Sequence, residues 1–238
     1  MGTPFYLIHG ASQYADIPLA FYFVSGIVLV SLSYRGPSNG YGSSILAGLM
    51  FGFSAWTKNE GLVLSALIPL ALLTTATFAR RWKQSGKSCF LILIGIAPVL
   101  AMVLFHKIHL APVNSFYALN RPEQLAANLI DFDRQTHILI RFIKGAYNFG
   151  QWPFPWLPVL VVYTVFVRLS DQTSKADLFP FVLILLQAGS FFLVFLVFPQ
   201  DLTFYLDTTL DRLFLQLFPG LLFAIFSVLK TPEEIFTR

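Results

Sequence analysis

The chain has 238 residues, of which 56% are hydrophobic and only 12% charged, and its mean hydropathy is +0.68. Because a soluble domain carries about 25% charged residues, this composition excludes an ordinary soluble domain and is typical of an integral membrane protein. The net charge of +4 does not indicate nucleic-acid binding, because the basic residues gather in short loops between apolar runs, as they do in oriented membrane proteins.

Apolar runs recur along the chain and predict an all-α, polytopic transmembrane helix bundle of about seven spans. A span needs about 20 residues, and it must be helical because open backbone groups find no hydrogen-bond partner in lipid. In chain order the segments are 17–33, 43–56, 61–79, 89–105, 155–167, 178–198 and 213–229. The segment 43–56 is short, so it crosses a thinned bilayer or forms a hairpin with 61–79 that does not fully cross. Polar stretches such as RRWKQSGK and PQDLTFYLDTTLDR are predicted to be turns between spans.

The Lys and Arg residues of the short loops predict how the bundle is oriented. If the N-terminus lies on the outer side and the chain crosses seven times, the short outer loops hold only Lys58 and Arg212. The inner side then holds Arg35, Arg80, Arg81, Lys83, Lys87, Arg168, Lys175, Lys230 and Arg238. Most acidic residues fall on the outer side in this arrangement, several of them at helix ends. We therefore expect the polar chemistry of the protein at the outer face.

The segment 106–152 is predicted to be a long outer loop that contains an amphipathic helix. Its stretch NRPEQLAANLIDFDRQTHILIRFIKGAYNF begins with a proline suited to a first helical turn, and charged residues interleave with apolar ones at helical spacing. The apolar positions are Leu125, Leu129, Phe132, Leu139, Phe142, Ile143 and Tyr147. Such a helix lies flat on a membrane surface, so we expect it on the outer face, with Trp152 and Trp156 at the interface.

Asp16 stands two residues before Pro18 and a long apolar run, in the stretch ASQYADIPLAFYF. An aspartate at a helix start accepts hydrogen bonds from free backbone N–H groups and complements the helix dipole, which is a purely structural role. A charge beside hydrocarbon is also costly, and by default it marks a functional site. His9, Gln13 and Tyr14 add polar groups on the same side, so both interpretations stay open.

Two further polar stretches interrupt the apolar sequence. Lys58 and Glu60 form either an ordinary exposed turn, or an ammonium for a phosphate and a carboxylate for a hydroxyl or a metal ion. Asp211 and Arg212 are predicted to open the last span. They serve there as an interfacial anchor, or they present a guanidinium that binds a phosphate through paired hydrogen bonds.

Three of these stretches, QYADIPLAFYF, GLMFGFSAWTKNEGLVL and LDRLFLQLFPGLL, occur in an order that resembles the GT-C class of integral membrane glycosyltransferases. The resemblance is to the bacterial relatives of the dolichyl-phosphate-mannose protein mannosyltransferases, and it extends from about His9 to Leu229. It implies a hexosyltransferase that moves a sugar from a polyprenyl-phosphate donor to an acceptor. The active face would be the outer face of a bacterial inner membrane rather than the endoplasmic reticulum.

The resemblance also implies roles for individual residues. Asp16 and Glu60 would be catalytic, and Lys58 and Arg212 would bind the donor phosphate as it becomes a leaving group. The residues expected to position the donor or the acceptor are Gln13, Tyr14 and Asp211. No cofactor is assigned with certainty, although Asp16 offers a ligand to a divalent cation. The expected partners are the lipid-linked sugar and membrane lipids, and no nucleic acid is expected.

One part of the family pattern has no counterpart in this sequence. The main catalytic acid of the family lies in the first outer loop, ahead of the stretch that Asp16 matches. The resemblance therefore implies that residues 1–238 are a single transmembrane domain forming the C-terminal part of a larger GT-C fold. An N-terminal half or a partner subunit would complete that fold and supply the base.

The sequence is also compatible with two other function classes. A transporter or channel carries ionisable residues near mid-membrane and often has inverted repeats, whereas most acids here fall at outer helix ends and no repeat is apparent. A non-catalytic membrane scaffold is also compatible with the sequence. His106 and His109 have helical spacing but no evident third ligand, so they make a poor metal site.

Overall fold

The computed structural model describes residues 4–12, 14–35, 40–111, 122–150, 152, 154–197 and 201–236. Within these ranges the chain is helical apart from short connections and an isolated antiparallel bridge between Leu169 and Leu229. In chain order the helices are α1 (Pro4–Gly10), α2 (Asp16–Arg35), α3 (Tyr41–Thr57), α4 (Asn59–Ala79), α5 (Trp82–His109), α7 (Pro122–Ile130), α8 (Phe132–Asn148), α9 (Trp156–Val167), η1 (Lys175–Leu178), α10 (Phe179–Val197), α11 (Leu202–Val228) and α12 (Pro232–Phe236). The predicted all-α class is therefore confirmed.

Five helices are long and apolar enough to cross a membrane, namely α2, α4, α5, α10 together with η1, and α11. Each of them overlaps one of the apolar segments predicted from the sequence, so helices long and apolar enough to span a membrane occur at these five places. The two remaining segments are also helical, but α3 and α9 have only 17 and 12 residues.

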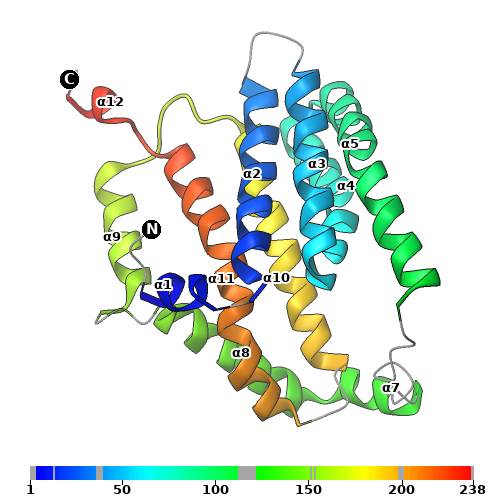
Figure 1. Ribbon diagram of the computed structural model, residues 1–238. Coiled ribbons are helices and arrows are strands. Elements are labelled where there is room, and N and C mark those ends of the chain that lie inside the picture. The colour runs from blue at the N-terminus through cyan, green and yellow to red at the C-terminus, as the bar shows by residue number, and fades with distance from the viewer. Residues whose placement is uncertain are drawn as a thin grey trace.

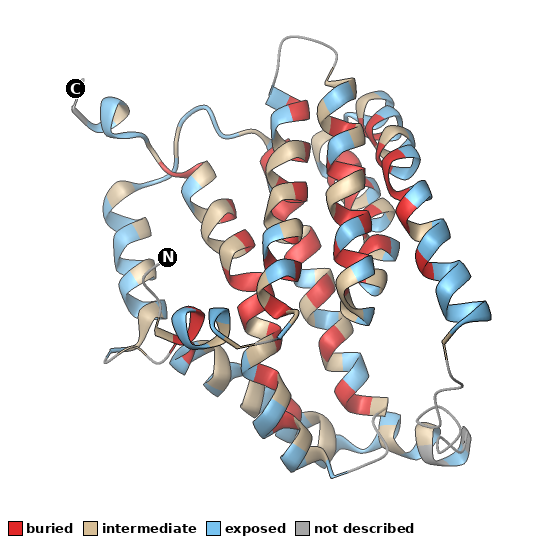
Figure 2. Cartoon of the chain, viewed as in Figure 1, coloured by how far each residue is buried: buried red, intermediate tan, exposed pale blue. Residues whose placement is uncertain are grey.

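The long helices carry large apolar side chains at many exposed positions as well as at buried ones. Figure 2 shows how exposed and buried residues are distributed over these helices. Ile27 and Ile68 are completely buried between helices, whereas Phe90 of α5 and Phe21 of α2 are more than half exposed. Water would penalise so many exposed apolar side chains, but hydrocarbon does not. The outward faces of the bundle are therefore suited to contact lipid.

Helices α2, α3, α4, α5, α10 and α11 run side by side along one approximate direction (Figure 1). Helix α8 lies across the end at which α2 begins, and it packs against α10 and α11. Helix α1 lies at the same end, and α9 stands to one side, next to α8. The end of the bundle at which α2 begins is thus covered by two crossing helices.

Helices α3 and α5 approach each other closely through two glycines. A Cβ added at Gly48 would overlap the backbone oxygen of Ile92, and one added at Gly95 would overlap the backbone oxygen of Ile45. Small residues let two helix backbones meet in this way inside a membrane. The contact holds the end of α5 beside the corner between α3 and α4, which carries part of the candidate site.

Two stretches predicted to be turns are largely helical. Helix α5 already begins at Trp82, so only Arg80, in the left-handed region (φ 52°), and Arg81 separate it from α4. Helix α11 begins at Leu202. Asp201 is its N-cap, and the side chain of Asp201 accepts hydrogen bonds from the backbone N–H groups of Thr203 and Phe204. The prediction that Asp211 and Arg212 open the last span is therefore wrong, because both lie well inside α11.

The amphipathic helix predicted in the segment 106–152 consists of two helices. The side chain of Asp131 accepts hydrogen bonds from the backbone N–H groups of Asp133 and Arg134. Asp131 is thus the N-cap of α8 and separates it from α7. The segment also begins later than predicted, since α5 continues to His109.

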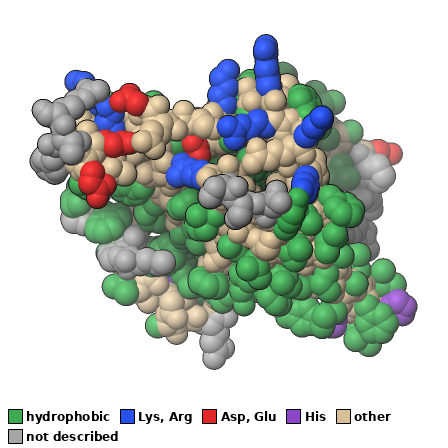
Figure 3. All heavy atoms as spheres, turned by 90° about the horizontal axis from the view of Figure 1, so that it is seen from above, with side chains coloured by type: hydrophobic (Ala, Val, Ile, Leu, Met, Phe, Trp, Pro, Cys, Tyr) green, Lys and Arg blue, Asp and Glu red, His purple; other side chains and the backbone are tan. Residues whose placement is uncertain are grey.

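Basic side chains gather at the end of the bundle where α2 finishes. Figure 3 shows this end from above, with Lys and Arg in blue. Arg35 ends α2, Arg81 precedes α5, and Lys83 and Lys87 lie in the first turns of α5. This end is opposite to the one at which α2 begins. Among the basic residues assigned to one side from the sequence, Arg238 lies outside the described residues.

Candidate functional site

The candidate site lies where α2 begins and is built around Asp16, whose side chain is completely buried. Its Oδ1 accepts hydrogen bonds from Nζ of Lys58 and from Nε2 of Gln216, both at 2.7 Å. Its Oδ2 accepts a hydrogen bond from Nε of Arg212 at 2.9 Å, and Nη2 of Arg212 lies at the same distance. One carboxylate therefore joins three parts of the fold: α2, the α3–α4 corner and α11.

This arrangement differs from a helix cap. Within the described residues, the carboxylate of Asp16 bonds side chains from distant segments and no backbone N–H of its own helix. A buried carboxylate is tolerated only when it is paired and hydrogen-bonded, and two cations and an amide meet that need here. The hydrogen bonds that compensate the burial of Asp16 also hold the side chains of Lys58, Arg212 and Gln216 in fixed positions.

Lys58 is placed by the sharp corner between α3 and α4. It is the single residue between the two helices, and its backbone is extended (φ −156°). The corner can close because Gly61 has no side chain, since an added Cβ would overlap the backbone oxygen of Ser54. The Lys58 ammonium lies 2.7 Å from Asp16 and 3.0 Å from an oxygen of Glu60, so it bridges both carboxylates.

Arg212 lies between a carboxylate and an aromatic ring. On one side it bonds Asp16, and on the other its Cζ lies 4.0 Å from the centre of the Tyr14 ring. A guanidinium stacks favourably on an aromatic face. The Tyr14 ring in turn meets the ring of His9 edge-on at 5.7 Å. Two of the predicted positions, Tyr14 and Arg212, are thus in direct contact.

Gln216 was missed by the sequence interpretation. It lies one helical turn after Arg212 on the same face of α11, and its side chain is completely buried against Asp16. Its Oε1 is buried and has no hydrogen-bond partner among the described residues. A glutamine inside the apolar run LFLQLFPGLL was the available signal. We refer to Asp16, Lys58, Glu60, Arg212 and Gln216 as the Asp16 cluster.

Two predicted site residues do not join the Asp16 cluster. Asp211 is exposed on α11, and no hydrogen bond or ion pair links it to the cluster in the part of the chain that the structure describes. The neighbouring acid Asp207 instead pairs with Arg141 of α8. Gln13 lies outside the described residues.

The cluster does not fit a divalent cation at Asp16. Both carboxylate oxygens already accept hydrogen bonds, two of them from positively charged groups that would repel a metal ion. The described residues contain no group of three His, Cys, Asp or Glu side chains that could hold a metal. His109 instead stacks on Phe105 and lies 3.2 Å from its backbone oxygen, at the exposed end of α5.

Helix α1 is fastened to α11 close to the cluster. Pro219 has no N–H, so the backbone oxygen of Leu215, four residues earlier, lacks its usual helical partner. The hydroxyl of Tyr6 donates a hydrogen bond of 2.6 Å to this oxygen. Burial raises the pKa of the Tyr6 hydroxyl, so this donor keeps its proton at neutral pH.

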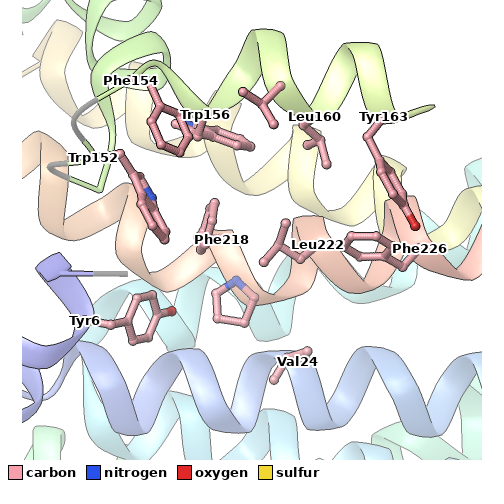
Figure 4. A pocket seen from close by; sticks show the side chains of 12 residues that line it. Tyr6, Val24, Trp152, Phe154, Trp156, Leu160, Tyr163, Phe218, Leu222 and Phe226 are labelled. Carbon is pink, nitrogen blue, oxygen red and sulfur yellow. The ribbon is translucent and has the colours of Figure 1, made fainter. Parts of the chain in front are cut away.

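An apolar groove of about 640 Å³ runs along α11 on the side that faces α9 (Figure 4). Tyr6 and Trp152 lie at one end of it, and Tyr163 and Phe226 lie at the other. Its end at Tyr6 is the end of the bundle that carries the Asp16 cluster. The polar cluster and the apolar groove therefore use consecutive stretches of α11, the cluster at Arg212 and Gln216 and the groove from Phe218 onward.

No family model, curated protein or solved structure matches this chain. The resemblance to glycosyltransferases noted in the sequence therefore remains an expectation. Its three stretches supply Asp16, Lys58 and Arg212, which are the residues that meet in the cluster.

Proposed function

We propose that this protein is a membrane glycosyltransferase, or part of one, that moves a sugar from a polyprenyl-phosphate donor to an acceptor hydroxyl. The observation that carries the proposal is that Lys58 and Arg212 both bond one buried carboxylate, that of Asp16. Two fixed cations at the edge of a membrane domain suit a phosphate that gains charge when its bond to the sugar breaks.

The exposure of the three groups supports different roles for them. Asp16 is inaccessible, whereas the side chains of Lys58 and Arg212 are 20% and 26% exposed. A phosphate can therefore reach both cations from the open side, while Asp16 holds them from behind. Asp16 is in this proposal a positioning residue, and Lys58 and Arg212 bind the leaving phosphate.

Glu60 is the accessible carboxylate of the cluster, with 26% of its side chain exposed. It positions the acceptor hydroxyl by accepting its hydrogen bond. The acceptor oxygen attacks the anomeric carbon, the bond between that carbon and the phosphate oxygen breaks, and the phosphate leaves with the electron pair. During the attack the hydroxyl proton passes to a base, which the resemblance assigns to an N-terminal half or a partner subunit.

The apolar groove supports a donor with a long hydrocarbon chain. It is lined largely by aromatic and aliphatic side chains such as Trp156, Phe218 and Leu222, and it follows the helix direction away from the cluster (Figure 4). An isoprenoid chain that lies along α11 gains stabilisation from this apolar surface. A phosphate at the near end of such a chain is then directed toward Arg212.

We further propose that α3 and α9 also lie in the membrane, which gives about seven spans, and that α8 rests on the outer membrane surface. Helix α8 has three faces. Ile138 and Phe142 contact the bundle, Leu139 and Ile143 are exposed and apolar, and Lys144 is exposed and charged. A helix with adjacent apolar and charged outer faces is suited to the membrane interface.

The basic end of the bundle supports the orientation. Arg35, Arg81 and Lys83 lie opposite the Asp16 cluster, and basic residues of short loops prefer the cytoplasmic side. The cluster then faces outward. A bacterial inner membrane suits this arrangement, with the lipid-linked donor presented at the outer face.

The function is tested by following a radiolabelled sugar from polyprenyl-phosphate donors into membrane acceptors. Membranes containing the protein should transfer label, and Arg212→Gln should reduce transfer at least a hundredfold. Arg35→Gln is the matched control, because Arg35 also pairs with a largely buried acid, Asp177, but at the opposite end. Equal transfer by both variants contradicts the proposal, and so does a lack of transfer in native membranes that hold the protein together with its natural partners.

A transporter is the second candidate, and the burial of the Asp16 charge inside a helix bundle is the observation that favours it. A transporter moves its substrate across sealed proteoliposomes without breaking a bond. Uptake of a labelled polar solute that depends on Asp16, in the absence of any sugar transfer, would replace the first proposal with this one.

A further inference from the structure

A second, polar cavity of about 530 Å³ lies between the α3–α4 corner and the last turns of α5. From the corner, Trp56, Lys58 and Glu60 line it, and from α5, His106 and Lys107 do so. It shares no lining residue with the apolar groove, which runs along α11. The two cavities are therefore separate, and the Asp16 cluster reaches this one through Lys58 and Glu60.

Lys107 differs from the cations of the Asp16 cluster in the partner of its charged group. Lys58 and Arg212 are each paired with a carboxylate. The ammonium of Lys107 donates to Oδ1 of Asn59 at 2.5 Å, which is a neutral amide oxygen, and among the described residues it forms no ion pair. The cavity thus has one cation that an anionic group can neutralise.

The other lining groups suit a hydroxyl-bearing molecule rather than a bare anion. Glu60 offers a partly exposed carboxylate to a hydroxyl, and Trp56, which is 56% exposed, offers an apolar ring face. Sugars combine hydroxyl groups with apolar C–H faces, so both kinds of surface can be matched at once. A volume of 530 Å³ is within the range of small-molecule sites.

We infer that this cavity holds the acceptor of the reaction and that the acceptor is anionic, a sugar or glycan unit bearing a phosphate or carboxylate. Its charged group binds Lys107, and its hydroxyl faces Glu60. The inference rests on the proposed function in one respect, because the bound molecule is an acceptor only if the protein transfers a sugar. The predicted preference for anionic sugars can be measured without a donor. Lys107 is then a specificity-determining residue that the sequence did not reveal.

The experiment measures binding to the purified protein by thermal stabilisation and by equilibrium dialysis, at constant ionic strength. The probes are glucose 6-phosphate, glucose 6-sulfate, glucuronate, glucose and inorganic phosphate. We expect the three anionic sugars to bind at least tenfold more tightly than glucose or phosphate alone. Lys107→Gln should remove most of this preference, and Lys107→Arg should retain it.

Two control variants separate recognition from structural support. Asn59→Ala removes the tie between α4 and α5 but leaves the charge of Lys107, so it should keep the preference for anionic sugars. Lys144→Gln removes an exposed charge on α8, outside the cavity, and should also keep it. Equal affinity for glucose and the anionic sugars, or an unchanged preference in Lys107→Gln, overturns the inference.

The outcome is independent of the test for sugar transfer. A preference for anionic sugars that depends on Lys107, in a protein without transferase activity, shows a binding cavity and removes only the proposed function. Transfer to anionic acceptors at the native rate by Lys107→Gln removes the inference and leaves the proposed function intact.

Discussion

The hydroxyl of Tyr6 donates a hydrogen bond to the backbone oxygen of Leu215, which is the oxygen that Pro219 leaves without a partner in α11. A proline inside a helix normally leaves such an oxygen to solvent or to a neighbouring side chain. Here a residue near the N-terminus satisfies it, so a local defect in α11 becomes the attachment point of α1. This contact lies beside both the apolar groove and the Asp16 cluster.

Replacing Tyr6 by Phe should lower the stability of the protein by about 1–3 kcal/mol, since it leaves the oxygen of Leu215 buried and unsatisfied. In a Pro219→Ala background the backbone N–H of residue 219 can bond that oxygen, so the same change should cost much less. Thermal unfolding in detergent measures the difference. Tyr163→Phe is the control, and equal losses in both backgrounds would show that the hydrogen bond contributes nothing.

The close contact of α3 and α5 makes a second prediction. Gly48→Ala places a methyl group against the backbone oxygen of Ile92, which cannot move without separating the helices. Overpacking of this kind costs about 1–3 kcal/mol and should lower the unfolding temperature. Gly42→Ala, at a position with open space around it, should have no such effect. An equally stable Gly48→Ala variant would refute the close approach.

The Asp16 cluster predicts a charge-dependent loss of stability. Asp16→Asn keeps the shape of the side chain but leaves Lys58 and Arg212 without their shared anion, which should cost about 3 kcal/mol. Adding Arg212→Gln should recover part of that loss, because one unpaired charge is removed. A double-mutant cycle on thermally unfolded protein measures the coupling. Additive losses would mean that the pair is not coupled.

If α8 rests on the membrane surface, the neighbouring positions 143 and 144 should differ in their contact with lipid. In a chain whose cysteine is removed by Cys89→Ala, a fluorescent label at Ile143→Cys should be quenched by brominated lipid tails. The same label at Lys144→Cys should be quenched little, because that position belongs to the charged face. Equal quenching at the two sites would show that α8 does not rest on the membrane surface.

The sequence predicted the helices well because apolar runs in lipid have few alternatives to a helix. It failed where partners distant in sequence decide the outcome. The stretch before Asp211 looked like a turn because it is polar, yet Asp201 caps it, Leu206 and Leu210 are buried, and Asp207 finds Arg141 on α8. None of these tertiary contacts is visible in a local pattern.

The candidate site was predicted in part. Asp16, Lys58 and Arg212 were singled out as polar residues within apolar sequence, but their meeting on one carboxylate depends on how α2, α4 and α11 pack. Gln216 was missed because a single glutamine in a leucine-rich run resembles an ordinary interhelical contact. Lys107 was missed because an exposed lysine near a helix end is common at membrane surfaces.

The partners of Asp16 stand 42, 196 and 200 residues further along the chain. During synthesis, Lys58 therefore emerges from the ribosome soon after Asp16, whereas Arg212 and Gln216 follow only when α11 is made. Until then the cluster holds two carboxylates, Asp16 and Glu60, and one cation, Lys58. Arg212 then supplies the second cation, so the contacts of Asp16 can be complete only after α11 has been made.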